Sequence, residues 1–151
     1  MKKHLLPVTG QFYKANLHCH TTFSDACLTP ERVKEIYKSK GYAVVAYTDH
    51  ELLFPQNHLT DETFLALNGV EHDVDEKAPD DDTGRKFHLC CIALEPNNHL
   101  TPCPEEAKYA YGNLTHLHLA KPVPGTLNFP KVYTPESINR FMAEVKNTVF
   151  S

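Results

Sequence analysis

Four short β-rich runs, each carrying histidines or carboxylates, constrain the fold of this chain more than any other feature. They are YKANLHCH (13–20), YAVVAYTDH (42–50), FLALNGVEHDV (64–74) and KFHLCCIAL (86–94). Branched and aromatic residues at this density favour strands. The first strand is expected to end near His18 and the third at Glu71. A helical pattern separates the first two runs, and this alternation predicts parallel strands in βα units whose polar ends meet at one rim.

Two segments carry the start signals of helices. In LTPERVKEIYKSKG (28–41), Thr29 is a suitable N-cap, Pro30 occupies the first helical position and Gly41 suits the C-terminal stop. In YTPESINRFMAEVKN (133–147), Thr134 and Pro135 repeat the same start. Each helix has an apolar face at helical spacing. The two faces are Val33, Ile36 and Tyr37 in the first helix, and Ile138, Phe141, Met142 and Val145 in the second.

The remaining segments complete a single-domain plan. The chain has 151 residues, 41% of them hydrophobic, which is enough for one core. The acidic stretch 73–86 is expected to form a solvated loop or a hairpin tip, without the spacing of an EF-hand. Residues 95–130, rich in Pro and Asn, are expected to be an irregular insertion. The apolar tail NTVFS (147–151) has the pattern of an opening fifth strand.

Composition excludes several classes of function. The formal charge of −4 offers no basic surface for nucleic acid or anionic membranes. No apolar run reaches the roughly 20 residues that span a bilayer, and the N-terminus lacks a signal-peptide pattern. We therefore expect a cytoplasmic protein that does not bind membranes. The five cysteines show no CxxC pair, which argues against a zinc ribbon or a disulfide framework, and Cys19 is expected to be a core thiol.

The stretch LHCHTTFSD (17–25) has the pattern of a metal site. In an extended strand His18 and His20 share one face, about 6.6 Å apart, so both can face one ion. Asp25 follows after a short turn that can fold it over the same rim. A lone His-x-His pair also arises by chance from strand alternation. Polar groups at the other strand ends strengthen the interpretation of this pair as metal ligands. The most important is Glu71, whose two oxygens can bridge two cations.

The motifs LHCHTTFSDA, YAVVAYTDH, NGVEHDV and KFHLCCIAL resemble, in order and spacing, those of the PHP (polymerase and histidinol phosphatase) family over roughly residues 14–94. The resemblance implies an α/β fold, a distorted (β/α)7 TIM-like barrel. It also implies two or three divalent ions (Zn, Mn or Fe) and hydrolysis of a phosphate ester, either a small phosphorylated metabolite or a nucleotide. The metal ligands that it implies are His18, His20, Asp25, His50, Glu71 and His88. Among them Asp25, His50 and Glu71 would be catalytic, and Asp49 would orient a ligand.

Departures from the family pattern leave alternatives open. Ala26 stands where the family usually has glycine, and neither a His-Pro nor an Asp-x-His motif follows Glu95. Residues 1–151 are therefore expected to be one PHP domain truncated at its C-terminus, roughly the first half of the barrel. Such a chain is either an active phosphoesterase or an inactive fragment that binds metal weakly or not at all. A homo-oligomer would cover its exposed barrel edge. A nucleic-acid-binding accessory domain is the third alternative, which the lack of a basic stripe disfavours.

The other histidines have weaker patterns. His116 and His118 form a second same-face pair, which is either a substitute for the missing ligands or two surface residues; we favour the surface interpretation. Four more lack ligand neighbours by spacing and are expected to be surface or structural residues: His4, His58, His72 and His99.

Overall fold

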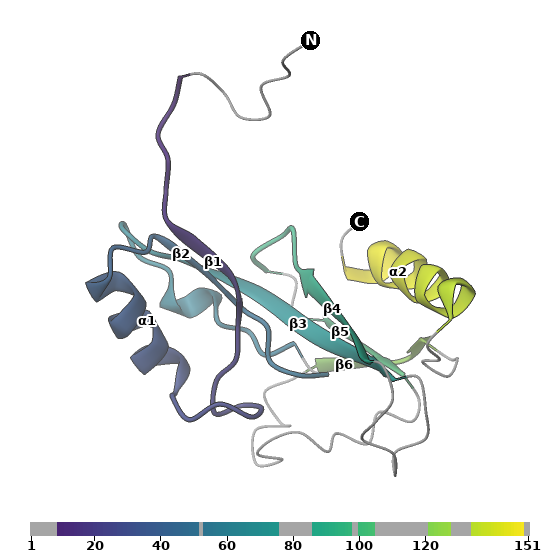
Figure 1. The fold of residues 1–151 in the computed structure, drawn as a ribbon. Helices are drawn as coiled ribbons and strands as arrows, with labels where there is room; N and C mark the ends of the chain where they lie inside the picture. Colours follow the sequence, from purple (N-terminus) through teal and green to yellow (C-terminus); the bar gives the residue numbers. More distant parts are fainter. Residues whose placement is uncertain are drawn as a thin grey trace.

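One four-stranded sheet organises the protein (Figure 1). The computed structural model describes residues 9–51, 53–75, 86–97, 100–104, 121–127 and 134–149. The sheet has the order β1-β2-β3-β4, with β1 (Ala15–Cys19), β2 (Val44–Tyr47), β3 (Leu65–Asp75) and β4 (Lys86–Ile92). The first three strands are parallel neighbours, and β4 pairs antiparallel with β3. The chain is therefore a mixed α/β protein.

Helix α1 (Pro30–Ser39) joins β1 to β2 and begins as its sequence predicts. The side chain of Thr29 accepts a hydrogen bond from the Arg32 amide at 3.3 Å, and Pro30 opens the helix where no amide donor is needed. After the helix Gly41 adopts a φ of 77°, a conformation that glycine enters at little cost. The predicted βαβ unit is confirmed for β1, α1 and β2.

The prediction of alternating βα units is wrong beyond β2. Among the described residues that connect β2 to β3, the only helical turn is the 3₁₀ helix η1 (Asn57–Leu59). Residues 76–85 connect β3 to β4 and are too few for a parallel crossover, which takes about a dozen residues or more, so β4 returns antiparallel. The pairing fits the hairpin alternative for the acidic stretch, whose residues 76–85 lie outside the described ranges.

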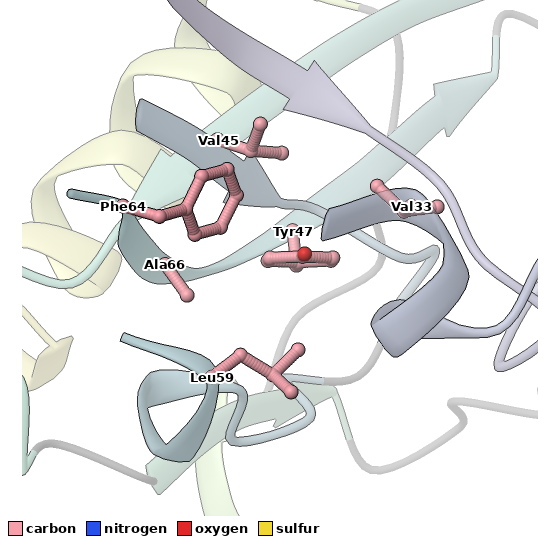
Figure 2. Packing of buried hydrophobic residues seen from close by; sticks show 6 residues of the cluster. All are labelled: Val33, Val45, Tyr47, Leu59, Phe64 and Ala66. Carbon is pink, nitrogen blue, oxygen red and sulfur yellow. The ribbon is translucent and has the colours of Figure 1, made fainter. Parts of the chain in front are cut away.

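The first core cluster holds α1 against β2 and β3 (Figure 2). Its buried members are Val33, Val45, Tyr47, Leu59, Phe64 and Ala66. Each large apolar side chain buried in this way contributes about 1.5–3 kcal/mol. Tyr47 also donates a hydrogen bond from its hydroxyl to the Pro30 carbonyl at 3.1 Å, which ties the end of β2 to the start of α1. Partly buried Cys19 packs against this cluster, in agreement with its predicted role as a core thiol.

Helix α2 (Pro135–Val149) packs on a second cluster through Phe141, which contacts Leu53, Val70 and Ala93. Its predicted start is confirmed, since the Thr134 hydroxyl accepts a hydrogen bond from the Ser137 amide at 3.2 Å. The prediction of a strand opening at Asn147 is wrong, because the helix continues through Val149. The helical apolar period simply runs on from Val145 to Val149, four residues later.

Two further strands lie within residues 95–130, where the sequence predicts an irregular insertion. β5 (Leu100–Pro104) and β6 (Lys121–Leu127) pair in parallel as a separate two-stranded sheet. Prolines within both strands hide the usual strand pattern, yet a two-stranded sheet consists of edge strands, which tolerate proline. No helix in the described part of the chain is long and apolar enough to cross a membrane.

Candidate metal centre

The strands β1 to β4 are neighbours in one sheet (Figure 1). Imidazoles, carboxylates and one thiol from these strands and the residues that follow them come together at a common site. His18 lies on β1 and His20 directly after it, and His50 follows β2 and pairs as an isolated bridge with Glu71 of β3. From β4 come His88 and Cys90. Because β1, β2 and β3 run parallel, polar groups that follow one strand meet those of its neighbours.

Glu71 stands at the middle of this site and is only 2% exposed. Its Oε1 lies 3.0 Å from His88 Nδ1 and 3.5 Å from His18 Nε2. Its Oε2 lies 2.9 Å from His20 Nε2 and 3.4 Å from His50 Nδ1. Each oxygen of one carboxylate therefore faces its own pair of histidines.

The prediction that β3 ends at Glu71 is wrong. β3 continues to Asp75, and Glu71 lies inside the strand with Cys90 of β4 directly opposite. The strand is longer because β4 supplies antiparallel hydrogen-bonding partners as far as Asp75, a pairing that the parallel-barrel expectation did not include. The backbone of Glu71 is held on both sides, by the bridge to His50 and by the pairing with Cys90. The position of this residue in the site is therefore fixed.

Two site residues escape the sequence analysis, Asp73 and Cys90. Asp73 Oδ1 lies 3.2 Å from His50 Nδ1 and 3.5 Å from His88 Nε2. Cys90 Sγ lies 3.0 Å from His18 Nδ1 and 3.8 Å from Glu71 Oε1. The signal that could have found them is the period of two along a strand: Asp73 shares a face with Glu71, and Cys90 with His88. The antiparallel register then sets Asp73 opposite His88.

Asp25 lies at the exposed side of the site and contacts two histidines. Its Oδ1 accepts a hydrogen bond from His20 Nδ1 at 2.7 Å, and its Oδ2 lies 3.6 Å from His50 Nε2. Burial acts to raise the pKa of Asp25, but the hydrogen bond from His20 and the nearby imidazole charges outweigh it and hold the pKa below its ordinary value. Asp25 is therefore an ionised carboxylate at neutral pH, and it belongs to none of the three candidate ligand groups among the described residues.

Asp49 acts on the turn that carries Asp25. It is buried and accepts hydrogen bonds from the Thr21 amide at 2.7 Å, the Thr21 hydroxyl at 2.9 Å and the Ser24 hydroxyl at 2.7 Å. These hydrogen bonds join its carboxylate to the turn rather than to a histidine. These bonds fix residues 21–24 beside β2, and so they set where Asp25 meets His20.

Carboxylates surround His50 and change its protonation. Burial acts to lower the pKa of His50, but the hydrogen bond to Asp73 and the charges of Asp73, Glu71 and Asp25 outweigh it, so the pKa lies above its ordinary value. In the metal-free site this ring carries positive charge more readily than an ordinary histidine.

The residues present fit a divalent metal ion. His20 Nε2 and Glu71 Oε2 are buried and make no hydrogen bond within the described structure. In the neutral ring of His20, Nδ1 donates its proton to Asp25, so the lone pair of Nε2 faces the lone pairs of Glu71 Oε2 at 2.9 Å. Two acceptors in such contact are stabilised by a cation, which a metal ion or a proton on Nε2 supplies. Donor atoms around a tetrahedral ion lie about 3.4 Å apart, close to several spacings here.

Three overlapping groups have donor atoms within 4.8 Å of one another. They are His20, His50 and Glu71; Glu71, Asp73 and His88; and His18, Glu71 and Cys90. Imidazole and carboxylate donors suit Zn, Mn or Fe, and the thiol favours zinc. The structure thus brings five of the six sequence-predicted ligands together around Glu71, with Asp25 beside them. Their role as ligands stays a prediction.

The remaining histidines lie away from these groups. His72 faces the opposite side of β3, is fully buried, contacts Glu51 Oε2 through Nδ1 at 3.2 Å and packs against the Phe141 ring. It is a structural residue, one of the two roles that the sequence allowed. His58 is exposed on η1. Four histidines lie outside the described residues: His4, His99, and the pair His116 and His118.

Comparisons with known proteins find a similarity in structure but no family. No protein-family model matches the chain, and no curated protein matches it. A solved structure of an amidohydrolase from Chromobacterium violaceum, with bound sulfate and no metal, is similar over 56% of this chain at 25% identity and a TM-score of 0.39. The matched part of this chain spans 29% of that protein's length.

Proposed function

We propose that this protein is a metal-dependent phosphoesterase, a hydrolase that uses two divalent ions. The observation that carries the proposal is the central position of Glu71. Its Oε1 faces His18 and His88 while its Oε2 faces His20 and His50. A carboxylate shared in this way is what a two-metal hydrolytic site requires, with ions about 3.5–4 Å apart.

The resemblance of the four motifs to the PHP family supports phosphate esters as the substrate class, either a small phosphorylated metabolite or a nucleotide. The fold supports the same proposal in its general plan: parallel strands carry the site at one rim, as in TIM-like barrels. The distorted (β/α)7 barrel of the PHP type is part of this proposal.

Divalent ions, when bound, supply an activated water and positive charge for the phosphate oxygens. The residues of this chain hold the donor atoms in place and supply the group that accepts a proton. Glu71 and its histidines hold their donor atoms fixed on the sheet, so little reorganisation is needed on binding. Asp49 fixes the turn of residues 21–24, and Asp25 presents an ionised carboxylate at the open side, where it can accept a proton.

The test is phosphate release from the purified chain supplied with Zn²⁺ or Mn²⁺, using an aryl phosphate and a nucleoside monophosphate as substrates. We expect turnover that Glu71→Gln abolishes and that Asp25→Asn reduces by about 10²–10⁴-fold, the range for loss of a general acid or base. Glu62→Gln is the matched control, because Glu62 is exposed and distant in sequence from the site.

The outcomes separate this proposal from the inactive-fragment alternative. Bound metal without phosphate release from either substrate would favour a metal-binding fragment and overturn the phosphoesterase. Equal activity in wild type and Glu71→Gln would show that any turnover comes from a contaminant.

A further inference from the structure

The two adjacent cysteines of β4 have different surroundings. Cys91 packs against the buried cluster of Leu53, Val70, Ala93 and Phe141, and burial raises the pKa of its thiol to about 12. Cys90 points to the other face of the strand, where it is exposed and stands beside His18 and Glu71. Alternation along a strand makes this difference unavoidable, since neighbouring side chains point to opposite faces.

We propose that Cys90 supplies a thiolate ligand to an ion held by His18 and Glu71, which makes this half of the site a sulfur-containing subsite for a thiophilic divalent ion. The inference rests on the metal centre of the proposed function and deepens it. It assigns a third ligand that the resemblance does not imply, and it selects Zn²⁺ over Mn²⁺ at this position, because thiolates bind zinc strongly while oxygen donors suit manganese.

The geometry supports a shared ion. One ring nitrogen of His18, one carboxylate oxygen of Glu71 and Cys90 Sγ all lie within 4.8 Å of one another, and Cys90 Sγ lies 3.8 Å from Glu71 Oε1. Cys90 and Glu71 are directly opposed in the β3–β4 register, so the sheet itself fixes their separation. These spacings suit an ion with a bond of about 2.3 Å to sulfur and about 2.0–2.2 Å to nitrogen and oxygen.

An independent observation comes from Glu71. This side chain is 2% exposed, and its Oε1 is the oxygen that lies near both Cys90 Sγ and His18 Nε2. Burial of an ionised carboxylate costs several kcal/mol unless positive charge compensates it. A metal ion at the site supplies that charge. The Cys90 proton is released to solvent as the sulfur–metal bond forms.

His88 also lies 3.0 Å from Glu71 Oε1, but with Asp73 it forms the neighbouring candidate group. The subsite of His18, Glu71 and Cys90 then has three protein ligands, which leaves one position of a tetrahedral ion open, as in catalytic zinc sites. Because the side chains of His18 and Cys90 are exposed, solvent reaches this subsite.

The test is a titration of the metal-free chain with Co²⁺ alone. A thiolate bound to Co²⁺ gives a sulfur-to-cobalt charge-transfer band in the near ultraviolet, which nitrogen and oxygen ligands do not give. We expect the band in wild type and in the control Cys27→Ser, whose thiol is exposed and belongs to none of the candidate ligand groups of the described residues, and its loss in Cys90→Ser. Zn²⁺ affinity should also fall more than about tenfold in Cys90→Ser. Tenfold is the smallest loss typical of removing a residue that only supports a metal ligand, and Cys90 is proposed as a ligand itself.

A second measurement uses wild type only and so does not depend on the folding of a variant. Zn²⁺ should protect Cys90 from alkylation while Cys27 continues to react, as read by peptide mass spectrometry. Bound cobalt without the band, or equal alkylation of Cys90 with and without Zn²⁺, would overturn the thiolate ligand and leave the proposed function standing. No bound cobalt in folded wild type would overturn both.

Discussion

Glu71 Oε2 lies 2.9 Å from His20 Nε2, and both atoms are buried without a hydrogen bond in the part of the chain that the structure describes. Two buried acceptors in this contact cost free energy in the metal-free protein. A cation that both atoms bind removes that cost. Stability should therefore depend strongly on metal.

Metal removal is the first prediction. A ligand that binds only the folded state adds about 2.7 kcal/mol at a concentration of 100 Kd, which shifts Tm by about 5–10 °C for a chain of this size. We expect the melting temperature, followed by circular dichroism, to fall by this amount when EDTA replaces Zn²⁺. A Tm that stays the same in EDTA and in Zn²⁺ would contradict the metal centre.

His50 sets the second prediction, which concerns pH. Its pKa in the folded, metal-free protein lies above the ordinary value of 6.5, because the Asp73 hydrogen bond and the carboxylates around it outweigh burial. A raised pKa contributes stability that is fully present below pH 6.5 and is lost as pH rises through the folded pKa. In EDTA, urea unfolding should show this loss as the pH rises above 6.5 in wild type.

His50→Gln should remove that part of the pH dependence, whereas His58→Gln, at an exposed position, should keep it. Metal binding has the opposite dependence, because a coordinating imidazole must be neutral, so Zn²⁺ affinity should rise over the same interval. Identical pH profiles for wild type and His50→Gln would rule out the raised pKa as the cause.

Asp49 gives the third prediction. Asp49→Asn replaces a buried carboxylate that accepts three hydrogen bonds from residues of the 21–24 turn. We expect a loss of about 2–3 kcal/mol in the free energy of unfolding, since bonds to a charged acceptor are strong and one partner is left unsatisfied. Metal affinity should fall about 10–100-fold, because the turn no longer holds Asp25 against His20.

Urea unfolding and Zn²⁺ titration measure both effects of Asp49→Asn. Glu62→Gln, an exposed substitution, should change the free energy of unfolding by less than about 0.5 kcal/mol. A variant at Asp49 with wild-type stability would mean that its hydrogen bonds do not hold the turn.

The packing of α2 gives the fourth prediction. Phe141 is 1% exposed, while its neighbour Met142 is 50% exposed. Phe141→Ala should cost about 3–5 kcal/mol through lost burial and the cavity that it leaves, and Met142→Ala should cost less than about 0.5 kcal/mol. Equal effects of the two substitutions in urea unfolding would place α2 in a different orientation from that in the structure.

Local chemistry explains which parts of the fold were predictable. The start of α1 follows from Thr29 and Pro30, because capping needs only neighbouring residues. The meeting of His18, His50 and Glu71 follows from the parallel pairing of β1, β2 and β3, although β3 continues past Glu71. These inferences use short-range patterns or a general rule of sheet geometry.

The missed features depend on a pairing that no short-range pattern reveals. Cys90 and Asp73 enter the site only because β4 returns antiparallel with Cys90 opposite Glu71 and His88 opposite Asp73. The parallel-barrel expectation gave no such register. The prolines of β5 and β6 likewise suggested an irregular segment, since proline is rare in central strands but compatible with edges.

Metal content per chain tests the central claim most directly. The protein should be purified without a histidine tag or chelator and analysed by plasma mass spectrometry, with circular dichroism as the check that it is folded. Two ions shared by Glu71 predict about two equivalents of Zn, Mn or Fe in wild type and in Glu62→Gln, and a loss of both in Glu71→Ala. Folded wild-type protein with almost no metal, or Glu71→Ala with unchanged metal content, would contradict a metal centre built around Glu71.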